Sequence, residues 1–93
     1  MQILLIDDER AIRRALREIL EFENCQVEEA ESGVQALQLL GQKTFDLIFS
    51  DIKMPQMDGI ELLEQIKKME LETPVVMISG HGTVETAVGA IKL

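Results

Sequence analysis

Three short apolar runs divide the chain and constrain its fold more than any other feature. They cover Ile3 to Ile6, Leu47 to Phe49 and Val75 to Ile78. All three are rich in Ile, Val, Leu or other bulky apolar residues and are bounded by polar or turn residues, a pattern typical of buried strands. A weaker run over Gln26 to Ala30 carries charge in its middle. It predicts a half-exposed strand at the edge of a sheet.

Amphipathic patterns that predict helices alternate with these strands. Two patterns begin with a residue that suits a capping box, Ser32 with Gln35 and Asp58 with Glu61. Thr83 is the candidate cap of a last helix. The first helix has its predicted apolar stripe at Ile12, Leu16, Ile19 and Leu20. Strands that alternate with helices imply right-handed crossovers and an α/β fold, with a parallel sheet covered on both faces.

The size and composition of the chain suit one globular domain over residues 1–93. Its apolar fraction is 46%, enough for an ordinary core. No apolar run is long enough to cross a bilayer, and the N-terminus lacks the pattern of a signal peptide. The single cysteine, Cys25, cannot form an intramolecular disulfide. We therefore expect a domain of the reducing cytoplasm with no membrane contact.

The charge balance argues against direct contact with nucleic acid. Nine basic and seventeen acidic side chains give a net charge of -8, whereas binding to phosphates needs clustered Lys and Arg. The basic cluster of the chain is formed by Arg10, Arg13, Arg14 and Arg17. Their spacing predicts that most of them lie on one exposed helical stripe with a few ion pairs, and leaves docking of a partner there open.

Acidic residues follow two of the predicted strands directly. Asp7 and Asp8 come after the predicted strand that ends at Ile6, Asp51 comes after the one over Leu47 to Phe49, and the hydroxyl of Ser79 follows the one that ends at Ile78. Ligands of open parallel sheets bind beyond the carboxyl ends of the strands. Clustered carboxylates repel one another unless protons or a cation relieve the repulsion, and Mg2+ prefers such oxygen ligands. Asp at a strand end also caps helices and makes turns, so both interpretations stay open at this point.

One stretch of the sequence is similar to a known family. The nine residues from Asp51 to Gly59 read D-I-K-M-P-Q-M-D-G and lie between an apolar strand and an amphipathic helix. Together with Leu4-Leu5-Ile6-Asp7-Asp8-Glu9, they resemble response-regulator receiver domains of two-component signalling. The stretch from Ile78 to Val88 is similar to receivers of sigma-54-dependent transcription activators. The resemblance implies a flavodoxin-like open sheet with strand order 2-1-3-4.

The resemblance also implies the roles of the acidic residues. Asp51 is then the phosphoacceptor, which takes a phosphoryl group from a sensor histidine kinase or a small phosphodonor. Asp7, Asp8 and Asp51 hold Mg2+, together with the backbone carbonyl of Lys53. Such a domain is a signalling switch for an output domain, with transcription control as the expected output. It takes part in its own phosphorylation and dephosphorylation but is not a conventional enzyme.

Further roles follow from the same resemblance. Ser79 is the hydroxyl that turns toward the phosphoryl group, and Gly80 leaves space beside it. Receivers of this family have a fifth strand with a lysine that pairs with the phosphate. The sequence ends at Leu93, so we expect a domain that is incomplete at its C-terminus, without the fifth strand and fifth helix. The strand ending at Ser79 would then be an apolar edge, suited to homodimer or edge-strand association.

Three other functions compete with this one. A receiver fold used only as a docking module would not need the full set of Asp7, Asp8, Asp51 and Ser79. A phosphatase with an Asp nucleophile needs a second carboxylate two positions later, where this chain has Lys53. A flavin-binding protein needs a Gly-rich and hydroxyl-rich phosphate loop after the first strand and aromatic rings to stack on the flavin. This chain has no such loop, and it has no Trp or Tyr.

Overall fold

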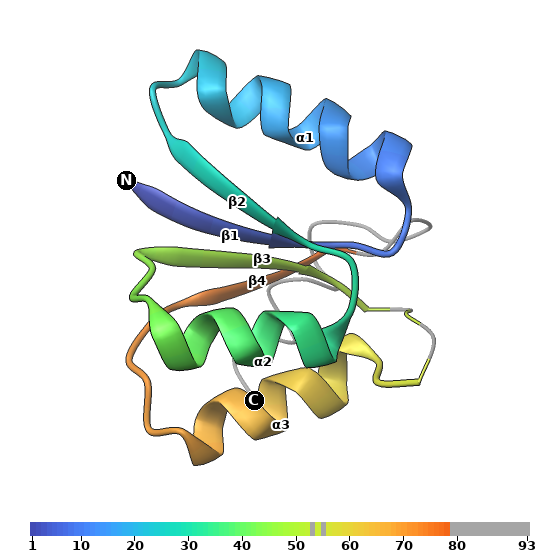
Figure 1. Ribbon diagram of the computed structural model, residues 1–93, viewed down its shortest axis with the longest axis vertical. Helices are drawn as coiled ribbons and strands as arrows, with labels where there is room; N and C mark the ends of the chain where they lie inside the picture. Colours follow the sequence, from blue (N-terminus) through green and yellow to red (C-terminus); the bar gives the residue numbers. More distant parts are fainter. Residues whose placement is uncertain (53, 55, 79–93) are drawn as a thin grey trace.

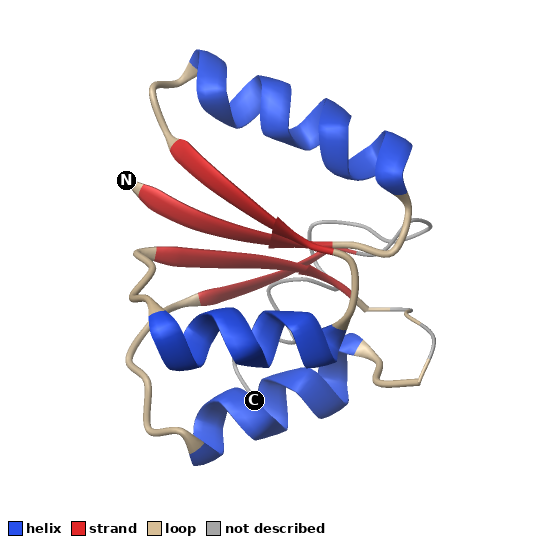
Figure 2. Cartoon of the chain, in the orientation of Figure 1, coloured by secondary structure: helices blue, strands red, loops and turns tan. Residues whose placement is uncertain are grey.

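The computed structural model describes residues 1–52, 54 and 56–78, and within them strands and helices alternate strictly. The described residues form four strands and three helices. The strands make one sheet, and the helices pack on its two faces (Figures 1 and 2). The elements are β1 (Gln2–Ile6), α1 (Arg10–Phe22), β2 (Gln26–Ala30), α2 (Gly33–Gln42), β3 (Leu47–Asp51), α3 (Gly59–Lys68) and β4 (Val75–Ile78).

The sheet is parallel, with the strand order β2-β1-β3-β4. This order confirms the flavodoxin-like α/β fold and the edge position of β2. The sequence order of the strands reverses between β1 and β3, because the chain first adds β2 on one side of β1 and then β3 on the other. Ligands of such sheets bind beyond the strand ends at this point. Among the described strands, β4 lies at the other edge.

Each face of the sheet has its own hydrophobic cluster. On one face, α2 and α3 cover Leu4, Ile6 and Ile48, all at most 1% exposed. On the other, α1 packs over Ile3, Leu5 and Val27. Successive residues of β1 therefore point to opposite helical layers, which explains why this strand is apolar throughout.

The predicted apolar stripe of α1 is wrong in one detail. Leu16 and Leu20 pack against β1 and β2, but Ile12 is 36% exposed and Ile19 is 61% exposed. No residue of α1 is fully buried. The helix makes its main contacts with the sheet over β2 and β1, and the side chains on one side of the predicted stripe stay in solvent.

The caps of α2 and α3 follow the predicted pattern. The Ser32 hydroxyl accepts a hydrogen bond from the Gln35 N–H at 3.1 Å, and a carboxylate oxygen of Asp58 accepts one from the Glu61 N–H at 2.8 Å. The Gln35 side chain accepts from the N–H of Glu31, one residue before the cap, so the reciprocal bond of a capping box is shifted by one position. Thr83 lies outside the described residues.

We predict that the cap of α3 contributes measurably to stability. Replacing Asp58 by alanine leaves the first N–H groups of α3 without this acceptor, at a cost of about 1 kcal/mol. Asp58→Asn keeps a side-chain oxygen and is the matched control, expected to lose only a small part of that energy. Urea unfolding monitored by circular dichroism measures both variants. Equal losses for the two variants would contradict the role of the cap.

Within the described residues, no helix combines the length and the apolar character that crossing a membrane requires.

Candidate functional site

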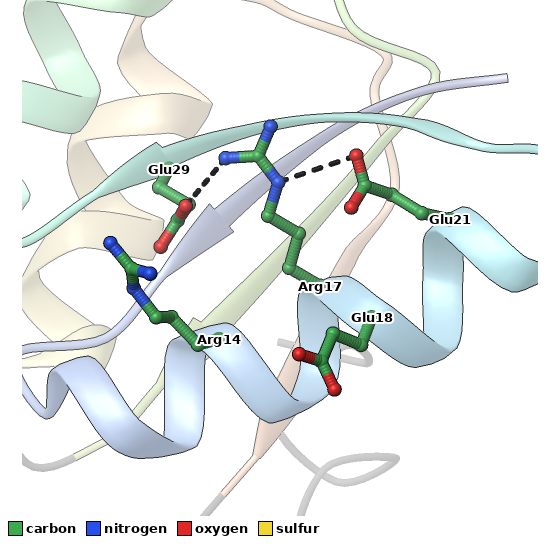
Figure 3. Close-up of a pocket in the computed structure, with 5 residues that line it drawn as sticks. All are labelled: Arg14, Arg17, Glu18, Glu21 and Glu29. Carbon is green, nitrogen blue, oxygen red and sulfur yellow. Dashed lines mark hydrogen bonds and ion pairs between the residues drawn. The ribbon is translucent and has the colours of Figure 1, made fainter.

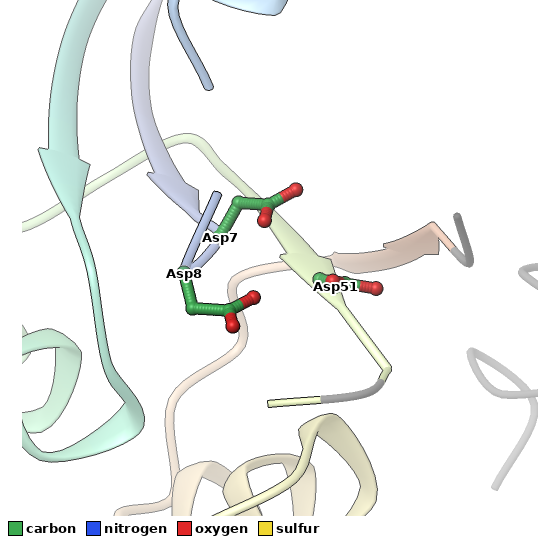
Figure 4. Close-up of side chains that lie close together, drawn as sticks. All are labelled: Asp7, Asp8 and Asp51. Carbon is green, nitrogen blue, oxygen red and sulfur yellow. The ribbon is translucent and has the colours of Figure 1, made fainter. Parts of the chain in front are cut away.

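Three carboxylates from two neighbouring strands meet at the carboxyl end of the sheet. Asp7 and Asp8 directly follow β1, and Asp51 is the last residue of β3. One oxygen of each carboxylate lies within 4.8 Å of the others, and Figure 4 shows the three side chains side by side. Asp7 is buried, Asp51 is half-buried and Asp8 is exposed, so the cluster opens to solvent on one side.

The sheet register brings these residues together. Ile6 on β1 pairs with Ser50 on β3, so the next residues, Asp7 and Asp51, lie at the same level. Strand β3 continues through Ser50 and Asp51, two residues beyond the predicted run. Asp51 is thereby the register partner of Ile78, and ladder pairing holds its backbone on the β4 side.

Within the cluster, the ionised carboxylate of Asp7 is destabilised by its surroundings. Burial raises the pKa of its carboxyl group, and repulsion from Asp51 and Asp8 raises it further. Two contacts oppose this shift. The Glu9 N–H donates to the Asp7 carboxylate at 2.8 Å, and the positive charge of Arg13 lowers the pKa. A carboxylate held this close to two others favours a proton or a cation beside it.

The oxygen donors suit a hard divalent cation. Carboxylates on neighbouring strand ends, one of them exposed, match the way Mg2+ is held by one or two carboxylates while it keeps several waters. The described residues bring neither a second cysteine nor a histidine near Cys25, so they offer no zinc-type donor set. The acidic cluster formed by Asp7, Asp8 and Asp51 is therefore a candidate magnesium site.

The backbone of Asp51 is in close contact with Gly59, the first residue of α3. The Gly59 N–H donates to the carbonyl of Ile52 at 2.7 Å. A Cβ at Gly59 would lie 2.3 Å from the Asp51 carbonyl oxygen and 2.9 Å from the Ile52 Cα. The φ angle of Gly59 is not positive, so this position needs glycine for space and not for backbone freedom. The start of α3 therefore packs directly on the backbone of Asp51.

The structure places only part of the predicted site. It brings Asp7, Asp8 and Asp51 together. Lys53, Ser79 and Gly80 lie outside the described residues, as do Pro55 and His81. Ile78, which precedes Ser79 in the sequence, is described and lies beside Asp51 in the sheet.

The sequence interpretation missed two residues next to the cluster. The spacing of the arginines predicts an exposed stripe, but the Arg13 side chain is only 12% exposed and contacts both Glu29 and the backbone of Asp7. The alternation along β2 contains part of the information needed to find this ion pair. Glu29 has the same parity on β2 as Val27, which places it on the face that α1 covers. A charged residue at such a position needs an ionic partner from the helix above it.

The comparisons with known proteins agree with this geometry. The family model described as response regulator receiver domain matches residues 3–93. The nitrogen assimilation regulatory protein NtrX of Azorhizobium caulinodans is 46% identical over 92 residues, which are 97% of this chain and 20% of that protein. The transcriptional regulatory protein ZraR of Klebsiella oxytoca is 38% identical over 99% of this chain and 21% of its own length.

A solved structure has the same fold. The receiver domain of the Francisella response regulator 1452 superposes with a TM-score of 0.86 and 30% identity, covering 98% of this chain and 75% of that one. The chain spans about one fifth of the length of the curated relatives it matches. Relatives such as NtrX and ZraR agree with the resemblance to receivers of sigma-54-dependent transcription activators. From its acidic cluster, its strand order and these matches, the chain belongs to the response regulator receiver domain family.

Proposed function

We propose that this chain is a phosphorylation-dependent switch whose phosphoacceptor is Asp51. The observation that carries the proposal is the meeting of Asp51 with Asp7 and Asp8 at the point where the strand order reverses. Family membership supports a signalling role of this kind. In this proposal residues 1–93 belong to a receiver domain, which acts as a phosphoacceptor and not as a conventional enzyme.

The proposed reaction transfers a phosphoryl group to a carboxylate oxygen of Asp51. This oxygen attacks the phosphorus atom of a phosphohistidine on a sensor kinase. A P–O bond forms, the P–N bond breaks, and the histidine nitrogen keeps the electron pair of that bond. Mg2+, when bound, neutralises charge on the transferred group. Asp7 and Asp8, with the Lys53 carbonyl as a further ligand, would hold the metal beside Asp51.

We propose that the residues after β4 respond to phosphorylation of Asp51. Ser79 follows Ile78, and Ile78 is the register partner of Asp51, which supports placing the Ser79 hydroxyl and Gly80 near the phosphoryl group. Phosphorylation adds negative charge and strong hydrogen-bond acceptors at Asp51. A hydroxyl that turns toward them would bias the segment that follows, which is a two-state switch.

The proposed partners are a sensor histidine kinase and an output domain. The regulatory names of the relatives favour transcription control as the output. We assign the domain to the cytoplasm, where such a kinase would reach it. The net charge of -8 argues that this segment does not itself contact nucleic acid. Homodimerisation or association through the β4 edge is a further proposed property.

Phosphorylation of Asp51 can be tested with a small phosphodonor. We expect the intact protein, incubated with acetyl phosphate and millimolar Mg2+, to gain one phosphoryl group by mass spectrometry. Asp51→Asn should abolish this gain, because an amide oxygen is a poor nucleophile. Beryllofluoride with Mg2+ should shift the backbone amide resonances around Asp51 in the wild type and leave Asp51→Asn unchanged.

Asp58→Asn is the matched control, since it makes the same chemical change at an acid that caps α3. This variant should be phosphorylated like the wild type. Wild-type protein that neither gains a phosphoryl group nor responds to beryllofluoride would instead support a docking module that works without phosphorylation.

A further inference from the structure

Arg13 links helix α1 to β2 and to the residue that follows β1. Its Nε donates to a carboxylate oxygen of Glu29 on β2 at 2.8 Å, and its Nη1 donates to the backbone carbonyl of Asp7 at 2.8 Å. The side chain is 12% exposed and that of Glu29 is 20% exposed. The planar guanidinium presents its donors in a fixed fork, so one side chain can serve both acceptors at once.

Glu29 is itself held from a second side. Its other carboxylate oxygen accepts from Nη1 of Arg17 at 2.6 Å, and Nε of Arg17 lies 3.4 Å from Glu21 (Figure 3). The hydrogen bond from Arg17 is the main cause of a lowered pKa at Glu29, so the carboxylate stays ionised at neutral pH. Glu29 is therefore a fixed anion on β2 that orients the fork of Arg13.

Arg13 supplies the last of three constraints on Asp7. The Asp7 N–H donates to the Ala30 carbonyl at 3.1 Å, and the Asp7 carboxylate accepts from the Glu9 N–H at 2.8 Å. The bond from Arg13 fixes the Asp7 carbonyl. This carbonyl lies in the same peptide plane as the Asp8 N and Cα, so fixing its orientation restricts the directions in which the Asp8 side chain can leave the backbone.

We propose that Arg13, braced by Glu29, is a positioning residue for the acidic cluster, holding Asp7 and Asp8 in the arrangement that binds Mg2+. The inference rests on the proposed function, since it assigns a role to residues beside the proposed metal site. Arg13 acts through the backbone of Asp7 and does not touch the metal.

The direction in which Mg2+ affinity changes when Arg13 is removed distinguishes a positioning role from simple electrostatic repulsion. A positive charge near a cation site repels the cation, so removing it should tighten Mg2+ binding. If Arg13 orders the ligands, removing it should weaken binding. Supporting groups around metal ligands typically contribute tenfold to 100-fold in affinity, roughly the range expected here.

The experiment is an Mg2+ titration of the unphosphorylated protein, followed by backbone amide resonances at 0.15 M ionic strength. Arg13→Gln should bind Mg2+ about tenfold more weakly than the wild type. Arg14→Gln is the matched control, because it removes the same charge from the next residue of the same helix. It should bind as the wild type does or slightly more tightly.

Two more variants keep the inference testable if Arg13→Gln is poorly folded. Arg13→Lys keeps the charge, but one ammonium group cannot reproduce the planar fork, so it should rescue affinity only in part. Glu29→Gln removes the anion that orients Arg13 and leaves Asp7 unchanged, and it should also weaken Mg2+ binding. The amide resonances of Asp8 and Glu9 in the metal-free protein should shift in each of these variants.

Equal Mg2+ affinities for Arg13→Gln and Arg14→Gln, or full rescue by Arg13→Lys, would overturn the positioning role. A wild-type protein that does not bind Mg2+ would instead overturn the proposed function, so the two failures are distinguishable.

Discussion

Replacing Gly59 by alanine should destabilise the domain severely and disturb Asp51 at the same time. The added Cβ would lie 2.3 Å from the Asp51 carbonyl oxygen and 2.4 Å from the Met77 Cε. Met77 ends in a flexible side chain that can move, but the carbonyl belongs to a strand paired on both sides. Relief therefore requires a shift of α3 or of β3.

We expect Gly59→Ala to cost about 3 kcal/mol, at the upper end for overpacking, because the contact is with backbone. This is a large part of the 5–15 kcal/mol, roughly, that stabilises an ordinary domain. Urea unfolding measures the loss. The fraction that stays folded should also react more slowly with acetyl phosphate, since any shift of β3 moves the Asp51 carboxylate.

Gly41 offers a matched control within the same fold. It lies in α2, and a Cβ there would meet nothing within 4 Å. Alanine is preferred over glycine in helices, so Gly41→Ala should keep or raise the stability, by up to about 1 kcal/mol. If Gly59→Ala were as stable and as reactive as Gly41→Ala, the close packing of α3 on Asp51 would not matter.

Asp7→Asn should have two effects of opposite sign. Without metal, the variant should be more stable than the wild type at neutral pH, because it removes a buried charge that two other carboxylates repel. Asparagine keeps an oxygen that can accept the Glu9 N–H. Its Mg2+ affinity should fall by about tenfold to 100-fold, since a charged group of the proposed site is lost. Thermal unfolding with and without Mg2+ shows both effects.

The pH dependence of this stabilisation follows from the raised pKa of Asp7. The folded state binds a proton more readily than the unfolded chain, whose Asp7 titrates near 3.8. The cost of ionising Asp7 therefore accumulates as the pH rises from about 3.8 through the raised pKa, and is fully present above it. The advantage of Asp7→Asn should be largest at neutral pH and disappear below about pH 3.8.

Glu64→Gln is the control for the loss of one negative charge, because Glu64 is exposed on α3. It should leave both the metal-free stability and the Mg2+ affinity nearly unchanged. An Asp7→Asn protein that is no more stable than the wild type at pH 7 would show that the acidic cluster carries little strain without metal.

In this site, the carboxylates needed for the proposed function also lower the stability of the metal-free domain. The carboxylates that would hold Mg2+ and accept the phosphoryl group are brought together before the metal arrives, and the metal-free domain carries their repulsion. Substitutions that remove a carboxylate should therefore improve stability while they remove function.

Much of the fold was predictable from local patterns. The run over Val75 to Ile78 and the charged run over Gln26 to Ala30 both form strands with the predicted bounds. The caps at Ser32 and Asp58 form as their spacing indicated. These features depend on neighbours close in sequence, or on alternation along one strand, and such information is present in the chain itself.

Residues whose role depends on a distant element could not be assigned in this way. The position of Arg13 depends on Glu29, sixteen residues away, and on the carbonyl of Asp7. The exposure of Ile19 depends on which strands α1 covers. The extension of β3 to Asp51 depends on its pairing with Ile78.

By itself, the sequence determined the alternation of strands and helices, and it placed acidic residues at two strand ends. That outcome is local, because the hydrophobic pattern selects the elements and the turns. Only the tertiary structure decided that Asp7, Asp8 and Asp51 lie within reach of one cation, that Gly59 packs on the carbonyl of Asp51, and that Arg13 contacts Asp7. The physical reason is that strand order, register and helix packing fix which groups meet, and they bring Asp7 and Asp51 together from opposite halves of the chain.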